Sequence, residues 1–230
     1  MYGAKIPEVI QQLLRWNKGR STSSSSKTMI LIDATCSMGQ LLDQTKSNVQ
    51  IMLERIKGVL AENGIDESGV LMKIAVYRNY NIDLIYQESS WETDAKNLKQ
   101  FLNTVSCQGG WGNEALEVGL RRAAEEIDGG LSQVIVIGDA PANTAAEVTG
   151  KQNRSSYGRE YWDKKLPGIQ ESEVYVETLK SKAVPIHTLY LQDRAKQQFT
   201  EFSASTAGSS FYLNVNDASS ADMLVEIVNV

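Results

Sequence analysis

Residues 27–37 have the sequence Lys-Thr-Met-Ile-Leu-Ile-Asp-Ala-Thr-Cys-Ser. The apolar run ends on Asp33, and a polar loop leads from it into a segment whose apolar residues recur with a period near 3.6 up to Leu60. A short continuous apolar run is typical of a strand buried on both faces, whereas the periodic segment predicts an amphipathic helix. The stretch therefore predicts the first strand, loop and helix of an α/β domain.

The same alternation of strands and helices continues along the chain. Further strands are predicted at 70–77, 131–138, 186–191 and 210–215, and helices at 94–105, 114–127, 171–182, 195–204 and 221–230. A short run at 82–86 after a polar turn predicts a hairpin with one antiparallel edge strand. Residues 144–170 form a long polar excursion. We expect a doubly wound, mostly parallel sheet with helices on both faces, in one domain over residues 27–230.

Residues 1–26 are expected to form a separate N-terminal region. Apolar residues at 9–16 have helical spacing, and the Ser-rich stretch 21–26 that follows has the composition of a flexible tether. This amphipathic helix either packs on its own domain or docks elsewhere, and the sequence leaves both alternatives open.

The composition limits the classes of function. Of the 230 residues, 42% are apolar and 22% are charged, which fits a folded domain, and the net charge of −5 disfavours nucleic-acid binding. The chain has only two cysteines, no signal-peptide pattern and no apolar run long enough to span a membrane, so a cytoplasmic location is expected. The single histidine, His187, lies in a predicted strand, which leaves little material for His-rich metal sites or His-based triads.

Oxygen-bearing side chains follow two of the predicted strands. Asp33, Thr35 and Ser37 come from one tight loop, and Asp139 follows the strand at 131–138. Glu114 is predicted to open a helix after the glycine-rich loop and would supply a third carboxylate. Hard oxygen donors of this kind suit Mg²⁺ or Mn²⁺, and Mg²⁺ often leaves a position for an outside oxygen. Ligands of open parallel sheets bind at the carboxyl ends of the strands, where Asp33 and Asp139 are predicted to lie.

These residues carry a resemblance to a known family. Asp33-x-Thr35-x-Ser37, the glycine loop and Ile137-Gly-Asp139 resemble the three loops of the metal-ion-dependent adhesion site of von Willebrand factor A (vWA) domains. The likeness is nearest to the intracellular branch found beside atypical alpha-kinases. The segments that match this branch are Tyr77-Arg78-Asn79, Gly109-Gly110, Glu114 to Leu120, Asp139-Ala-Pro141 and Phe202 to Gly208.

The resemblance implies a role for each ligand. Asp33 would hold the cation partly through water, Thr35 and Ser37 would ligate it through their hydroxyls, and Asp139 would bind in the outer shell. Many family members use a threonine from the second loop. Residues 109–114 contain none, so the role falls to Glu114. Asn143 stands where the kinase-associated branch is expected to have a histidine, and the resemblance does not imply phosphoryl transfer by this chain.

Other interpretations of the same residues stay open. Asp33 and Asp139 could be helix N-caps, Glu114 could be a first-turn residue favoured by the helix dipole, and Cys36 and Cys107, beside two of the predicted metal loops, could form a regulatory disulfide. Three aromatic residues are candidates for a partner-binding rim or else pack the long loop down, and Asn143 is a further rim candidate; the aromatic residues are Trp111, Tyr157 and Trp162.

The expected function is a non-enzymatic, divalent-cation-dependent protein-binding module, with a partner's acidic side chain completing the coordination. One alternative is a vWA-fold scaffold without bound metal. The other is an aspartyl phosphotransferase of the haloacid dehalogenase type, which needs an acid two residues after the nucleophile. That position is Thr35 here, so the leaving group would lack its proton donor.

Overall fold

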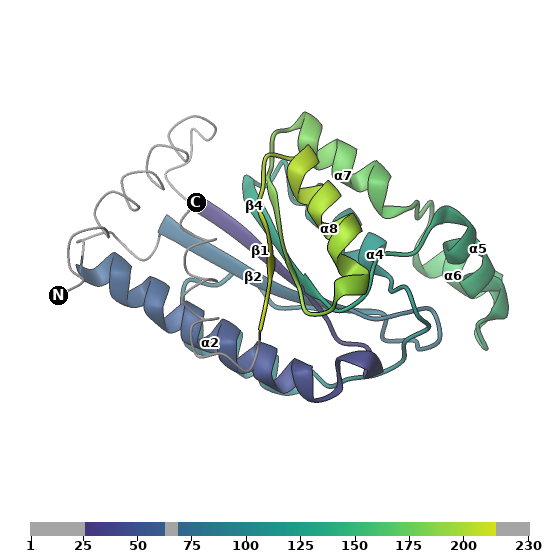
Figure 1. Cartoon of the computed structure of the whole chain (residues 1–230), viewed down its shortest axis with the longest axis horizontal. Coiled ribbons are helices and arrows are strands. Elements are labelled where there is room, and N and C mark those ends of the chain that lie inside the picture. The colour runs from purple at the N-terminus through teal and green to yellow at the C-terminus, as the bar shows by residue number, and fades with distance from the viewer. Residues whose placement is uncertain (1–25, 63–68, 215–230) are drawn as a thin grey trace.

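The structure, a computed structural model, describes residues 26–62 and 69–214 (Figure 1). The predicted N-terminal helix and tether, apart from Ser26, and the predicted helix at 221–230 lie outside the described residues. No helix in the described ranges is long and apolar enough to cross a membrane.

Six strands form one mixed sheet in the order β3-β2-β1-β4-β5-β6. Their bounds are β1 Ser26–Asp33, β2 Val70–Tyr77, β3 Tyr86–Glu88, β4 Leu131–Gly138, β5 Ile186–Tyr190 and β6 Ser210–Tyr212. β1 lies at the centre between β2 and β4, and its apolar run pairs with both of them, Ile30 with Ile74 and with Ile135. All pairs are parallel except β2 with β3. The predicted doubly wound, mostly parallel sheet with one antiparallel edge strand is therefore confirmed.

Helices cover both faces of this sheet (Figure 1). The helices are η1 Cys36–Met38, α2 Gly39–Glu62, α3 Ala95–Thr104, α4 Leu116–Glu125, α5 Ala145–Arg154, α6 Arg159–Lys165, α7 Ser172–Ser181 and α8 Asp193–Ser205. One apolar core joins α2 and α3 to one face, and a second joins α4, α7 and α8 to the other. The helices predicted from the 3.6-residue periodicity thus bury their apolar sides against the sheet.

Two predictions about local structure were wrong. The second arm of the hairpin is not the apolar run 82–86, because Ile85 turns into a small third core and only Tyr86–Glu88 pairs with β2. The long polar excursion at 144–170, in which no helix was predicted, contains α5 and α6. A capping box starts α5, in which the Thr144 side chain accepts from the backbone of Glu147 and the Glu147 side chain accepts from the backbone of Thr144.

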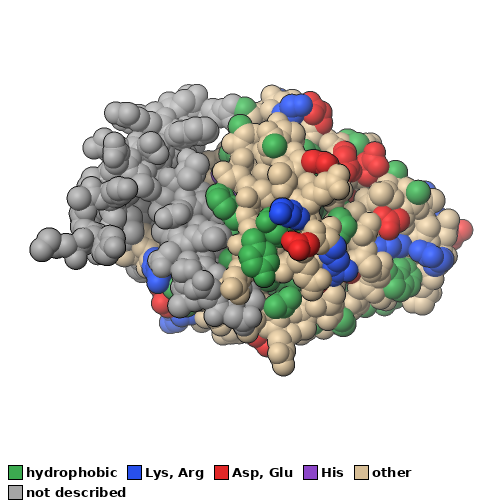
Figure 2. Space-filling view, viewed as in Figure 1, with side chains coloured by type: hydrophobic (Ala, Val, Ile, Leu, Met, Phe, Trp, Pro, Cys, Tyr) green, Lys and Arg blue, Asp and Glu red, His purple; other side chains and the backbone are tan. Residues whose placement is uncertain are grey.

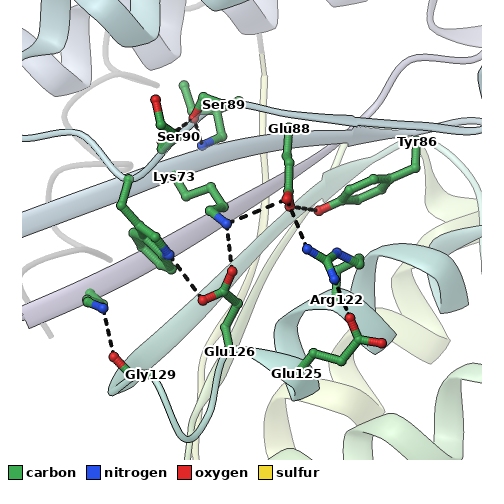
Figure 3. Close-up of polar contacts among 12 residues, drawn as sticks. Lys73, Tyr86, Glu88, Ser89, Ser90, Arg122, Glu125, Glu126 and Gly129 are labelled. Carbon is green, nitrogen blue, oxygen red and sulfur yellow. Dashed lines mark hydrogen bonds and ion pairs between the residues drawn. The ribbon is translucent and has the colours of Figure 1, made fainter.

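A half-buried ion-pair network fastens the edge strand β3 and the end of α4 to β2 (Figure 3). The Lys73 ammonium lies 2.6 Å from Glu126 Oε1 and 3.7 Å from Glu88 Oε1. Arg122 Nη2 lies 3.0 Å from the same Glu88 oxygen. Because the Lys73 and Glu126 side chains are largely shielded from water, the contacts help to hold the antiparallel edge in register.

Candidate functional site

The three loops predicted to carry the site meet at the carboxyl edge of the sheet. β1 and β4 are parallel neighbours, so Asp33 at the end of β1 lies beside Asp139, which follows β4. The strand order also reverses at β1, because the chain runs outward through β2 on one side and through β4 on the other. The predicted residues therefore lie at the topological switch point, where open α/β sheets bind ligands.

A chain of side-chain contacts joins the first loop to the third. Asp33 Oδ1 accepts from the Thr35 backbone N–H at 2.8 Å and from Thr35 Oγ1 at 2.7 Å. Thr35 Oγ1 lies 3.0 Å from Ser37 Oγ, which in turn donates to Asp139 Oδ1 at 3.1 Å. The two hydroxyls have only two hydrogens for these three side-chain contacts. The side-chain oxygens of Asp33, Thr35, Ser37 and Asp139 therefore lie close together, and one of their three contacts has no hydroxyl hydrogen to share.

Burial makes this cluster electrostatically unfavourable for its own carboxylates. Asp33 and Asp139 are both fully buried, and Asp33 Oδ2 has no hydrogen-bond partner among the described residues. Burial first, and then the charge of Asp139, raises the pKa of Asp33 to about 7. Asp33 is not a helix N-cap: the first helical residue after β1 is Cys36, and the flanking N-cap is Thr35.

Glu114 lies against the same cluster but does not open a helix as predicted. Its backbone pairs with Ala142 in an isolated parallel bridge, and α4 begins two residues later at Leu116. Glu114 Oε2 accepts from the Asn79 amide and Oε1 accepts from the Trp111 N–H at 3.3 Å. Burial, followed by the charge of Asp33, raises the pKa of Glu114 to about 8. The third loop thus fixes the backbone of Glu114, and its carboxyl group is held by Asn79 and by the Trp111 N–H.

Gly110 allows the second loop to approach the first. Its φ of +118° disfavours any residue with a side chain. A Cβ at this position would also lie 3.2 Å from Glu114 Oε1 and 3.3 Å from Thr35 Cβ. A backbone hydrogen bond also joins the two loops, since the Cys36 N–H donates to Gly109 O at 2.9 Å. Glu114 and Thr35 are therefore brought close together through a glycine.

Arg194, in the first turn of α8, is a site residue that the sequence analysis missed. Its Nε donates to the Asp139 carbonyl at 2.8 Å and its Nη2 donates to Asp139 Oδ2 at 2.7 Å. Arg194 follows β5, the next strand along the edge after β4. Its position just after the end of β5 is the sequence signal that could have identified Arg194 as a site residue.

A buried polar network lies behind the second and third loops. The Asn143 amide donates to Glu117 Oε1 at 3.1 Å, the Tyr80 hydroxyl donates to the same oxygen at 2.9 Å, and the Lys151 ammonium donates to Asn143 Oδ1. Glu117 is fully buried, which raises its pKa to about 7. Asn143 is also fully buried, so its prediction as a rim residue was wrong. Its amide is used to join α4 to α5.

The other predicted rim residues divide by exposure. Trp111 and Tyr157 are 39% and 42% exposed. Trp162 is fully buried, with its ring 5.2 Å from that of Tyr80, so it packs α6 down instead of facing a partner. Arg154 lies over the Trp111 ring at 5.9 Å, which links the second loop to α5. The rim that solvent reaches is therefore limited to Trp111 and Tyr157.

The side chains at this site do not form a ready-made cluster of His, Cys, Asp or Glu ligands. Within residues 26–62 and 69–214, no group of three or more His, Cys, Asp or Glu side chains is arranged to hold a metal ion. Cys36 is exposed, Cys107 is half-buried, and both are free thiols. Any cation bound here would therefore depend on the Thr35 and Ser37 hydroxyls together with the carboxylates.

Comparison with solved structures supports the fold. No family model matches the sequence, and no curated protein matches it. The structure is similar to a von Willebrand factor type A protein from Catenulispora acidiphila, with a TM-score of 0.60 and 11% identity over 91% of this chain and 43% of that one. It is also similar to the pilus adhesin SpaC from Lactobacillus rhamnosus GG in an open conformation, with a TM-score of 0.59 and 12% identity over 91% of this chain and 30% of that one.

The chain thus spans less than half the length of either neighbour. At these identities the likeness shows the fold alone. The chain has the α/β fold of von Willebrand factor A domains, with the Asp33, Thr35, Ser37 and Asp139 side chains gathered at the carboxyl edge of its sheet.

Proposed function

We propose that the protein is a non-enzymatic protein-binding module whose site at the end of β1 and β4 binds Mg²⁺ or Mn²⁺. The observation that carries the proposal is the chain of contacts that joins Asp33 Oδ1, Thr35, Ser37 and Asp139, while the other oxygen of the buried Asp33 carboxyl group, Oδ2, has no partner among the described residues. Hard oxygen donors, two of them hydroxyls, fit a small divalent cation.

The charge balance around the site supports a cation as well. Four carboxyl groups are buried there, on Asp33, Asp139, Glu114 and Glu117. The cationic side chains that interact with them are Arg78, Lys151 and Arg194. When all four carboxyl groups are ionised they outnumber these three cations, and an added positive charge would favour the ionised forms of the carboxyl groups whose pKa values burial raises.

In this proposal Asp33, Thr35 and Ser37 hold the cation, Asp139 and Glu114 supply further negative charge, and the exposed side of the site is left for an oxygen of the partner. A bound cation would supply Lewis acidity toward that oxygen. The SpaC neighbour is a pilus adhesin, which agrees with a role in protein binding.

A vWA-fold scaffold without metal is the second candidate, because the Arg194 guanidinium already neutralises Asp139 at 2.7 Å. A phosphotransferase is disfavoured, since the position that would need an acid is Thr35, whose hydroxyl is bonded to Asp33 Oδ1.

Thermal unfolding with Mg²⁺ or with chelator tests the proposal. At Mg²⁺ about 100-fold above its dissociation constant, the melting temperature of the parent should rise by about 5–10 °C. Asp33→Asn should lose this rise, because the amide cannot supply the negative charge. Asp43→Asn, a matched charge change on a side chain that is 83% exposed, should keep it. A parent without any rise would favour the metal-free scaffold.

A further inference from the structure

We infer that Arg194 is a second anchor for the acidic group of the partner, so that a carboxylate is held jointly by the cation and by this guanidinium. The inference rests on the proposed function and specifies the ligand class of the same site. It starts from the two bonds of Arg194 to Asp139, which use only one edge of the guanidinium.

The opposite edge of the guanidinium is available for a ligand. An arginine side chain has five N–H donors, and Asp139 accepts two of them, one from Nε and one from Nη2. No other described residue is recorded as accepting from the remaining three, which belong to Nη1 and Nη2. The side chain is 40% exposed. Its free edge has the two-pronged geometry that matches both oxygens of a carboxylate.

This guanidinium is bonded to a residue of the proposed cation site. Asp139 accepts from Arg194 through Oδ2 and from Ser37 through Oδ1, so one carboxyl group separates the arginine from the hydroxyl of a cation ligand. A partner carboxylate in contact with the cation could therefore reach Arg194 as well. The arginine also adds a positive charge to a site in which Glu114 would otherwise repel an acidic ligand.

Arg194 is fixed before the ligand arrives. A free surface arginine loses rotamer entropy when it binds, whereas the bonds at 2.8 and 2.7 Å already hold this one against the third loop. The surrounding surface is not generally basic: Figure 2 shows acidic and basic side chains interspersed over the part formed by α5 to α8. A local anchor, and not a diffuse positive field, then selects the acidic group.

NMR titration of the full chain with glutarate, in saturating Mg²⁺, tests the inference. We expect Arg194→Gln to weaken glutarate binding at least tenfold and to leave Mg²⁺ binding as tight as in the parent, or tighter, because a positive charge beside Asp139 has been removed. Arg194→Lys keeps the charge without the planar fork and should weaken glutarate less. Lys196→Gln removes a charge two residues along the same helix, on a side chain that faces the Tyr190 ring, and should change neither affinity. Neutral glutaramide should not bind.

The outcomes separate the two claims. If the parent binds Mg²⁺ but binds glutarate no better than Arg194→Gln does, or not at all, the anchor is overturned and the cation site stands. If the parent binds no Mg²⁺, the proposed function fails. In that case the anchor is tested in chelator. Glutarate binding by the parent that the Arg194→Gln variant loses would support the anchor, and no glutarate binding by the parent would overturn it.

Discussion

At the scale of single residues, burial decides which side chains can act. Asn143 and Trp162 were candidates for a partner-facing rim, yet both are fully buried and serve to connect α4, α5 and α6. Residue type and spacing do not reveal which way a side chain points within a loop, and this is why the predicted rim was too large. Arg194 was missed because no sequence motif identifies an arginine that bonds to an aspartate 55 residues away.

The structure confirms the prediction that His187 lies in a strand. It is buried in β5, and its Nδ1 accepts from the Ser209 N–H at 3.2 Å, so it is a satisfied strand residue. Burial lowers its pKa from 6.5 to about 4. The folded protein therefore keeps a neutral ring at pH values where the unfolded chain binds a proton.

The free energy of unfolding should reflect this difference. Between pH 6.5 and 4 only the unfolded state binds the His187 proton, so stability falls as the pH falls through this window, by about 2–3 kcal/mol. His187→Asn keeps an acceptor without the titration. Urea unfolding of both proteins in chelator from pH 4 to 8 should show their stability difference changing with pH. A difference that stays constant would mean that the folded pKa of His187 is not lowered.

At the scale of elements, periodicity and burial predicted most of the fold. β1, β2 and β4 are near-continuous apolar runs, and α2, α3 and α8 have regular apolar stripes, so their signals were strong. α5 and α6 were missed because their residues are mostly polar. The signal in the sequence was the capping box Thr144 to Glu147 rather than an apolar stripe.

Gly208 shows how tightly the connection after α8 packs on the sheet. A Cβ at this position would lie 2.0 Å from the carbonyl oxygen of Ile186 in β5, and backbone cannot give way as a flexible side chain would. Gly208→Ala should therefore lower the free energy of unfolding by about 3 kcal/mol or more, or prevent folding.

The matched control for this change is Gly150→Ala. Gly150 lies within α5 with nothing within 4 Å of its added Cβ, and alanine favours a helix, so this change should stabilise the protein by about 0.5–1 kcal/mol. Chemical denaturation measures both variants. Equal stability of the two would contradict the close approach of residue 208 to β5.

At the scale of the whole molecule, the topology creates the site. Asp33 and Asp139 are 106 residues apart in the sequence and become neighbours because β1 and β4 pair in parallel at the point where the strand order reverses. This juxtaposition followed from the strand pattern and could be predicted. The contact of Ser37 with Asp139 and the bridge between Glu114 and Ala142 could not, because they depend on how loops close over one another.

The central claim is that this edge of the sheet binds a divalent cation. Isothermal titration of Mn²⁺ into the metal-free protein tests it most directly, with Asp33→Asn and Thr35→Val as variants that remove a charge and a hydroxyl from the donor set. We predict one Mn²⁺ per chain in the parent and none at this site in either variant. No binding to the parent, or equal binding to all three proteins, would contradict the account.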